Sequence, residues 1–575
     1  MDIPPPLATG GRNGDLHRAL LDVWPSPGEL DIILEVPAST SVLFHGVICM
    51  PYSSVLSKDK AAQSWQDILR LPPPDSHPVM IARKLLLLGT FLQGIPSNPV
   101  KGSGTMSRLL VETASKLVTN NDDLVNSLEG IECLMIEGMF HNNTGNLRRA
   151  WITHRKAMSI AQMMGLHRAP SPTAKVVDAE TQARIDPEYM WYRLVITDRY
   201  LSLMLGLPQA SLESPFGSPE ALASCTPMER MERMQSIAGG RILQRINVHD
   251  LAETHEADKL LREAASLMPP QWWLAPSISD TNGDGNNALT ETLRLMNQFT
   301  HYHLLAQLHL PYLLHPSDDR RYDYSKITTV TASREILLLF VPFRSSGAAV
   351  TAYCRGVDFL AFIASTVLTL AHIDTRRRRA PYVLGFLAHQ RQSDRGLLER
   401  TLECMENMAQ GNSDAMARRI SDVLRRLLSV EANAANGLSY CSTVASNESG
   451  AELEASGMCL DDTLQINIPY FGTVKIEETK PLPLVRRVSP APGPVGYQIG
   501  ELSANADWQN VPSHLDSLTE AGDGRLTPDR SLLVPGLAAD VDDWALQGVD
   551  MALFGNLIWG ATELDELASQ GLAGP

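Results

Sequence analysis

The chain has few cysteines, and none of them lie close together in the sequence. Its 575 residues include seven cysteines, of which the nearest two, Cys441 and Cys459, are 18 positions apart. Zinc-binding knuckles place paired cysteines within about two to four residues of each other, so this spacing excludes a cysteine-based zinc module within the chain. Scattered cysteines without a secretory leader also indicate reduced thiols in the cytosol or nucleus. We therefore expect no metal and no other cofactor in this chain.

Long apolar runs and catalytic motifs are also missing. The longest uncharged apolar run, Phe359 to Ala371, has 13 residues, whereas a membrane-spanning helix needs about 20. We expect this run to be a buried core helix, and we expect no membrane partner. The sequence has no nucleophile elbow, no phosphate-binding loop and no dinucleotide fingerprint. These absences favour a protein that is not an enzyme.

Positive charge is scarce. Lys and Arg number 49 against 65 Asp and Glu, which gives a formal net charge of −16. Contacts to phosphates need clustered Lys and Arg, so this balance argues against a broad nucleic-acid-binding surface. The imbalance is concentrated in residues 501–575, which contain 13 acidic residues, two arginines and no lysine. A protein-binding role fits this distribution better.

Helical periodicity dominates the middle of the chain. Apolar residues recur at three- and four-residue intervals in block after block, and no stretch shows sustained strand alternation. We predict an all-α, multi-helix array over residues 81–430, preceded by an irregular segment at 1–80. Residues 431–535, rich in Ala, Asn, Ser, Gly and Pro, are predicted to be a mostly disordered linker with a candidate docked hairpin at 463–476. A short acidic-hydrophobic tail, residues 536–575, follows.

Two of the expected helices carry the most informative pattern. The first runs from Leu147 to Met164, and the second begins at Pro187 and ends at Gly206. Asp198 lies in the middle of the second helix's apolar face. A carboxylate is costly to bury without a cation or backbone donors, so either Asp198 faces partly outward or an arginine reaches it. The candidate partners on the first helix are Arg148, Arg149 and Arg155.

These two helices also carry a family resemblance. The first closes with GLHR, and the second ends in ITDRYLSLMLGLP. This combination resembles the middle homology region of fungal zinc-cluster (Zn2Cys6) transcription factors, in which a helix reading roughly LWW...LDRYLSLLLGRP is a hallmark. Segments similar to those of the family follow in the same order at His301 to Pro316, Tyr353 to Asp374 and Asp542 to Gly560. The resemblance covers about residues 80 to 430 and the tail, and it implies a helical regulatory domain that acts in the nucleus.

The resemblance stops at the module that binds DNA. Zinc-cluster factors hold two zinc ions with six closely spaced cysteines and place a short helix in the DNA major groove. The cysteine spacing here has nothing of the kind, so we expect DNA contact only indirectly or through an N-terminal module missing from this chain. Zinc is expected only with such a module.

Three hypotheses for function follow. The leading one is a fungal pathway- or gene-cluster-type transcription regulator with an activation tail. The second is a coregulator that does not bind DNA and is tethered to a zinc-cluster factor. The third and most distant is a helical small-molecule-binding protein. The expected partners are transcription coactivators, together with either a zinc-cluster factor or a second copy of the chain in a homodimer.

The tail interleaves acidic residues with bulky apolar ones. In an acidic activation segment, the acids keep the segment solvated while the apolar side chains fold into a partner's groove. The alternative is a terminal helix that caps the protein's own core. The residues that we assign to the activation tail are Asp542, Asp543, Trp544, Phe554, Leu557 and Trp559.

A run of four arginines follows the apolar run. One interpretation is a solvated loop between two helices, and the other is a nuclear import signal. The run is too short to be a DNA-binding surface by itself. Its members are Arg376, Arg377, Arg378 and Arg379.

One segment matches the calcium-loop pattern residue for residue, with Asp280, Asn282, Asp284 and Glu291 at the ligand positions. A working loop lies between two helices, but prolines in the preceding MPPQWWLAPSIS prevent a regular incoming helix. The sequence also has no second loop to pair with this one. We interpret the match as a coincidence in a turn-rich segment.

Overall fold

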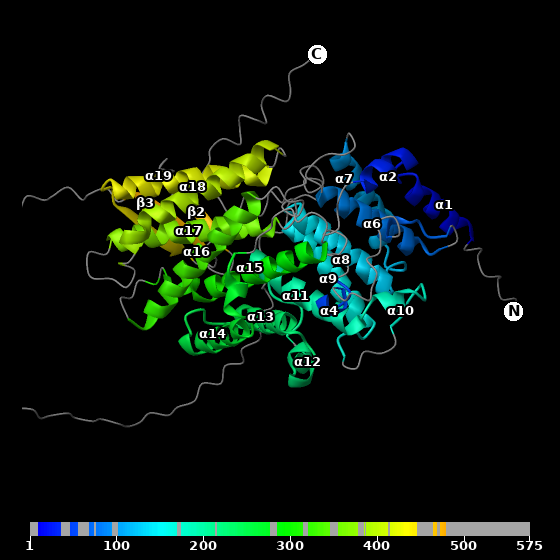
Figure 1. The fold of residues 1–575 in the computed structure, drawn as a ribbon, viewed down its shortest axis with the longest axis horizontal. Helices are drawn as coiled ribbons and strands as arrows, with labels where there is room; N and C mark the ends of the chain where they lie inside the picture. Colours follow the sequence, from blue (N-terminus) through cyan, green and yellow to red (C-terminus); the bar gives the residue numbers. More distant parts are fainter. Residues whose placement is uncertain are drawn as a thin grey trace, which may run out of the picture. The chain divides into compact units, whose positions relative to one another are not determined.

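The structure is a computed structural model. It describes residues 10–35, 47–55, 68–73, 76–94, 102–168, 174–212, 215–275, 285–313, 315, 320–345, 355–377, 385, 387–411, 415–445, 464–468 and 472–478. All of these belong to one of the chain's two compact units, and the other unit, Lys480–Leu546, lies outside them. The described residues are overwhelmingly helical (Figure 1), which confirms the all-α prediction.

Helices follow one another along the chain, with short 3-10 and π turns between some of them. The first half contains α1 (Gly10–Leu21), α2 (Pro27–Leu34), α4 (Tyr52–Val55), α6 (Pro78–Gly94), α7 (Ser103–Ala114), the π-helix η1 (Ser115–Thr119), α8 (Leu128–Asn143), α9 (Leu147–Met163), α10 (Thr181–Arg184) and α11 (Pro187–Leu205). The second half contains η2 (Pro215–Gly217), α12 (Pro219–Ala223), α13 (Pro227–Gln244), α14 (Leu251–Ser266), η3 (Pro270–Trp273), α15 (Gly285–Leu313), η4 (Arg320–Tyr322), α16 (Asp323–Ser345), α17 (Gly356–Arg377), α18 (Leu387–Gly411) and α19 (Ala415–Ala435).

The segment 1–80 differs from the irregular structure that we expected, because α1, α2 and α4 lie within it. Ser26 and Glu29 form a capping box at the start of α2, in which the Glu29 carboxylate accepts the Ser26 backbone N–H at 3.0 Å. Pro27 occupies the first helical position, where its missing N–H is not needed. The S-x-x-E spacing was therefore a helix-start signal inside a segment that otherwise looked like turns.

Helices α9 and α11 join the two large apolar clusters of the interior. One cluster is built mainly from α6, α7, α8 and the first half of α11, and the other mainly from α15 to α19. In α9, Met158 belongs to the first cluster and Leu147 to the second; in α11, Leu194 belongs to the first and Leu201 to the second. The two helices therefore run antiparallel, and residues at the middle of each lie between the clusters.

Local sequence signals fix where these two helices begin and end. The Asn146 side chain accepts the Arg149 N–H at 3.2 Å and caps α9. Asp186 caps α11 by accepting the Tyr189 N–H at 3.1 Å. Gly206 ends α11 with φ of 69°, a left-handed conformation that glycine adopts without strain. The start of α11 at Pro187 and its end at Gly206 are those that the sequence indicated.

Helix α15 continues through an internal proline, Pro311. Proline lacks an N–H, so the carbonyl four residues earlier, that of Gln307, loses its helical partner. Arg245, which follows α13, donates to the carbonyl of Leu308 at 3.0 Å and to that of Gln307 at 3.5 Å. The Arg245 side chain thus supplies a donor in place of the N–H that Pro311 lacks, and the 29-residue α15 continues through the core.

A small antiparallel sheet follows α19. Its strands are β1 (Tyr440–Ala445), β2 (Leu464–Ile468) and β3 (Gly472–Glu478), in the order β1-β3-β2. The candidate hairpin at 463–476 corresponds to β2 and β3, in which Ile466 pairs with Val474. Both side chains are buried in the cluster that contains α17, so the sheet packs on the helical body. Strand β1 was not foreseen, because YCSTVA is too short and too polar on its own to show a strand period.

Helix α17 is the core helix that the apolar run predicted. By length and composition alone, its segment Gly356–Thr375 is sufficient to cross a membrane, but the segment is buried within the fold, with only Thr375 at its end partly exposed. It contacts α16, α18, α19 and β1.

We predict that Gly130→Ala destabilises the protein by several kcal/mol. A Cβ at position 130 would lie 2.1 Å from the carbonyl oxygen of Val125, a backbone atom that cannot move aside without shifting the start of α8. Chemical denaturation followed by circular dichroism measures the loss. The matched control is Gly104→Ala in α7, where a Cβ meets nothing within 4 Å. The control should remain within about 1 kcal/mol of the parent, and equal stability of both variants would contradict the prediction.

Candidate functional site at the junction of α9 and α11

Asp198 lies at the middle of α11 and is 1% exposed. Its Oδ1 pairs with Nε of Arg155 on α9 at 2.7 Å. Its Oδ2 accepts the backbone N–H of Ala210 at 2.7 Å. The carboxylate therefore has a cation on one side and a backbone donor on the other, the two kinds of partner that a buried carboxylate requires.

Arg155 also holds the turn that follows α11. One guanidinium nitrogen donates to the carbonyl of Pro208, and the guanidinium carbon lies 4.4 Å from the centre of the Trp151 ring. Ser202 donates to the same Pro208 carbonyl at 3.1 Å. Because Asp198 reaches Ala210 in this turn, the segment after Gly206 folds back onto the α9–α11 junction.

Burial and pairing act in opposite directions on Asp198. Burial raises the pKa of Asp198 above its ordinary value, while the Ala210 N–H and the Arg155 guanidinium lower it. The net effect is a raised pKa, so burial is the largest influence. A carboxylate in this position depends on its two partners to stay charged.

Arg199, the next residue of α11, joins this junction to α13. It is 2% exposed, and it donates to Oε1 of Gln209 at 2.9 Å and to the carbonyl of Ser236 at 3.0 Å. Burial lowers the pKa of Arg199 to about 10, against the raising effect of Asp198. A Cβ at Gly240 would lie 2.9 Å from the guanidinium carbon, so the glycine makes room for it. Our sequence analysis missed Arg199, although the DR pair within ITDRYLSL was its signal.

Similar buried ion pairs join other neighbouring helices. Each consists of a carboxylate that is no more than 10% exposed on its side chain and an arginine from a different part of the chain. The Asp198 pair differs from them in its position between the two apolar clusters. These other pairs are Glu132 with Arg83, Glu232 with Arg193, Asp358 with Arg344, Asp394 with Arg334 and Glu431 with Arg391.

A serine, a histidine and an aspartate form a chain that looks like a hydrolase triad. The Ser325 hydroxyl lies 3.0 Å from Nδ1 of His309, and Nε2 of His309 lies 3.3 Å from Oδ1 of Asp258. Catalysis by such a chain requires a serine that substrate can reach. Ser325 is 1% exposed, and burial lowers the pKa of His309. We conclude that the three residues tie α14, α15 and α16 together.

The structure pairs Asp198 with one of the three arginines considered. Arg148 and Arg149 lie in the first turn of α9, two helical turns before Arg155. The first turn of α9 lies against the second cluster through Leu147, whereas Asp198 lies further along, between the clusters. Position along the helix therefore selects Arg155.

The other residues singled out from the sequence fall largely outside the described part. Glu291 lies within α15 and pairs with Arg294 at 3.0 Å, whereas Asp280, Asn282 and Asp284 are not among the described residues. Arg376 and Arg377 end α17. The remaining candidates that lie outside the described residues are Arg378, Arg379, Asp542, Asp543, Trp544, Phe554, Leu557 and Trp559. Within the described ranges, no group of three or more His, Cys, Asp or Glu residues could hold a metal ion.

The described body is thus a helical array in which buried charged residues join helices. Comparison with known proteins identifies the family of this helical body. Residues 76–214, which contain the α9–α11 junction, match the family model described as the fungal specific transcription factor domain. No solved structure matches the chain.

Curated relatives extend this match over almost the whole chain. A protein named "Dehydrocurvularin biosynthesis regulator" from Aspergillus terreus is 34% identical over 94% of this chain and 81% of its own length. A protein of the same name from Alternaria cinerariae is 32% identical over 96% of the chain and 81% of its own length. "Transcription factor sdnS" from Sordaria araneosa is 30% identical over 97% of the chain and 78% of its own length.

The chain belongs to the family of fungal-specific transcription factors. Its relatives carry the names of transcription factors and regulators, not of enzymes. The predicted family, the regulatory function and the absence of an enzymatic role are therefore confirmed.

We predict that Asp198→Ala destabilises the protein by roughly 3 kcal/mol, because it leaves the Arg155 guanidinium without its buried carboxylate. Thermal melting followed by circular dichroism measures the effect. The control is Asp122→Ala. The Asp122 carboxylate also pairs with α9, since its Oδ1 lies 2.7 Å from Nζ of Lys156. The Asp122 side chain is 86% exposed, so its loss should change stability by less than about 1 kcal/mol. Melting of the Asp198 variant within a degree or two of the parent would show that the junction does not depend on this pair.

Proposed function

We propose that the chain activates transcription of a biosynthetic gene cluster in the nucleus. The observation that carries this proposal is the similarity, over more than nine-tenths of the chain, to two proteins named as regulators of dehydrocurvularin biosynthesis. Dehydrocurvularin is the product named for those two relatives. For this chain, the proposal extends only to control of a small-molecule biosynthetic pathway.

The helical body and the tail have different roles in this proposal. The body, with its two clusters joined through Asp198 and Arg155, is the regulatory domain. The tail supplies the activation segment, since residues 536–575 contain seven acidic residues and no lysine or arginine among bulky apolar ones. Coactivators are the proposed partners of that tail.

Nuclear import would use the arginine run. Arg376 and Arg377 form the end of α17, and Arg378 and Arg379 continue the sequence beyond it. Basic residues at the end of a helix are also favoured by the helix dipole. A fluorescent fusion of the full chain in which only Arg378 and Arg379 are replaced by Ala separates an import signal from this structural role.

A second candidate is a coregulator that is tethered to a zinc-cluster factor, alone or as a homodimer. Within residues 1–575 the cysteine spacing supplies no set of ligands for the two-zinc module, and this candidate would reach a promoter through its partner. The two candidates share the tail and the body but differ in how the protein reaches a promoter.

We predict that the purified 575-residue chain has no specific affinity for promoter DNA and binds no zinc in stoichiometric amount. Its acidic balance and cysteine spacing supply neither a basic surface nor a metal-held recognition helix. A gel-shift titration at several salt concentrations, with metal analysis of the same sample, tests both. Nanomolar binding to one sequence that weakens steeply with salt would contradict this expectation.

We predict that residues 536–575, fused to an unrelated DNA-binding domain, raise transcription from a reporter. Replacing Trp544, Phe554, Leu557 and Trp559 with Ala should abolish the effect, because apolar side chains supply most of the binding energy. The control replaces the acidic residues Asp542 and Asp543 with Asn, which should reduce activity only in part, since the acids mainly increase solubility and association rate. A silent reporter with the intact tail would favour a tail that only caps the protein's own core.

A further inference from the structure

Helices α15, α16 and α17 contact one another in the array (Figure 1), and a small cavity lies between them. Its volume is about 10 Å³, which is room for about one water molecule. Helix α17 lines the cavity with apolar side chains alone, whereas the other two helices add polar ones. The polar side chains are those of His303 and Gln307, one helical turn apart on α15, and Ser333 on α16.

Each of these three side chains carries a buried polar atom that has no hydrogen-bond partner among the described residues. The atoms are Nε2 of His303, Nε2 of Gln307 and Oγ of Ser333. The residues are 4%, 6% and 0% exposed, so bulk solvent does not reach them. Buried polar groups are almost always hydrogen-bonded, either to protein or to an ordered water. Three unpaired groups around one cavity therefore indicate a ligand that pairs with all of them.

Ser333 does not use the partner that its own helix offers. Buried serines and threonines commonly donate to the carbonyl four residues earlier in a helix. On α16, Thr329 donates to the Ser325 carbonyl at 3.0 Å. On α17, Ser365 donates to the Ala361 carbonyl at 2.7 Å. The Ser333 hydroxyl makes no such bond within the described part of the chain, so it remains available to a ligand in the cavity.

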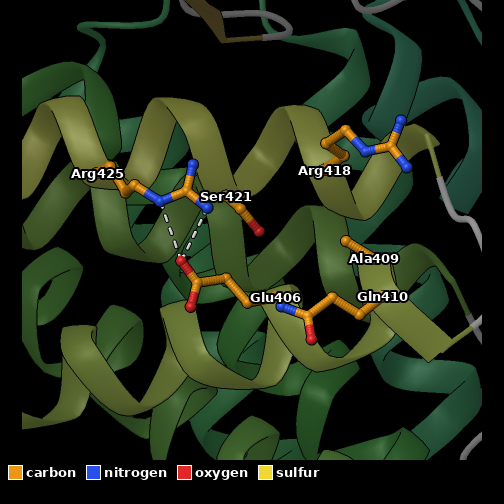
Figure 2. Close-up of a pocket in the computed structure, with 6 residues that line it drawn as sticks. All are labelled: Glu406, Ala409, Gln410, Arg418, Ser421 and Arg425. Carbon is orange, nitrogen blue, oxygen red and sulfur yellow. Dashed lines mark hydrogen bonds and ion pairs between the residues drawn. The ribbon is translucent and has the colours of Figure 1, made fainter.

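The groove between α18 and α19 is larger, about 240 Å³, but it lacks these features. Figure 2 shows that Arg425 pairs with Glu406 across it, at 2.9 Å. The Ser421 hydroxyl donates within its own helix, and Arg418 and Gln410 are exposed. The polar groups that line this groove are thus either paired or in contact with solvent, and none of them selects a particular ligand.

The chemistry of the interior cavity selects a neutral ligand that both donates and accepts hydrogen bonds. The Gln307 amide nitrogen only donates, which excludes a cation such as sodium or ammonium. Burial lowers the pKa of His303 to about 4, so its ring is neutral near pH 7. The side chains that line the cavity then carry no charge, and an anion such as chloride would lose its hydration without gaining a cation. Among ligands with one non-hydrogen atom, water meets these conditions.

We propose that this cavity is a binding site for one water molecule that bridges α15 and α16. The water accepts from the Gln307 amide and pairs with the His303 ring and the Ser333 hydroxyl. These three partners are within the two to four that a buried water needs. The water joins two helices as the buried ion pairs do elsewhere in the body, but without charge. Gln307 is also the residue whose carbonyl loses its helical donor at Pro311, so the bridge supports α15 at its break.

Replacing Ser333 by Ala gives opposite results with and without this water. With the water, Ser333→Ala removes one of its partners and lowers the melting temperature. Without it, the change removes an unpaired hydroxyl, introduces a better helix former and raises the melting temperature. The matched control is Ser365→Ala, the same change at a buried serine whose hydroxyl is already paired. We expect Ser333→Ala to melt about 2 °C below this control, and melting at or above it would overturn the proposal.

A crystal structure of the full chain observes the site directly. At a resolution that shows other buried waters, we expect density for one water within about 3.2 Å of the His303, Gln307 and Ser333 atoms. An empty cavity, or three side chains that pair with one another instead, would contradict the proposal even if Ser333→Ala melts below its control. Neither measurement involves transcription, so both results are independent of the proposed function.

Discussion

The buried pair of Asp198 and Arg155 is the interaction on which the arrangement of the described body depends. It lies where α9 and α11 pass between the two apolar clusters. Apolar contacts are not directional, so two amphipathic helices can slide past each other at little cost. A buried carboxylate permits only the register in which its cation and its backbone donor arrive together. The Ala210 N–H is that donor, so the pair also fixes the turn after α11.

The same constraint recurs along the array. Glu132, Glu232 and Asp394 each lie on one helix and pair with an arginine from another part of the chain. A helical array built only from Leu, Val and Ala stripes has many packings of similar free energy. Buried charges reduce that number, because any packing that separates a pair leaves a charge without a partner. This explains why so many titratable groups lie in the interior of this helical body.

Much of the fold is determined by local sequence. The helical period and the capping residues Asn146, Asp186 and Gly206 place α9 and α11, and the position of Asp198 within an apolar face requires a buried partner. These features depend on residues within one or two helical turns of each other. The same local logic, applied to Ser26 and its Glu three residues later, also locates α2.

Tertiary structure alone decided which partners meet. Three arginines on α9 had the right charge, but only the crossing of α9 and α11 brings Arg155 to Asp198. After Gly206 the chain turns back, so that the Ala210 N–H reaches Asp198. No periodicity of apolar residues in the sequence predicts this turn. Strand β1 exists because β3 pairs with it, since its own sequence is too short to specify a strand. Such contacts depend on how segments that are distant in the sequence are placed relative to one another. That placement is set when the two apolar clusters of the described body are buried together.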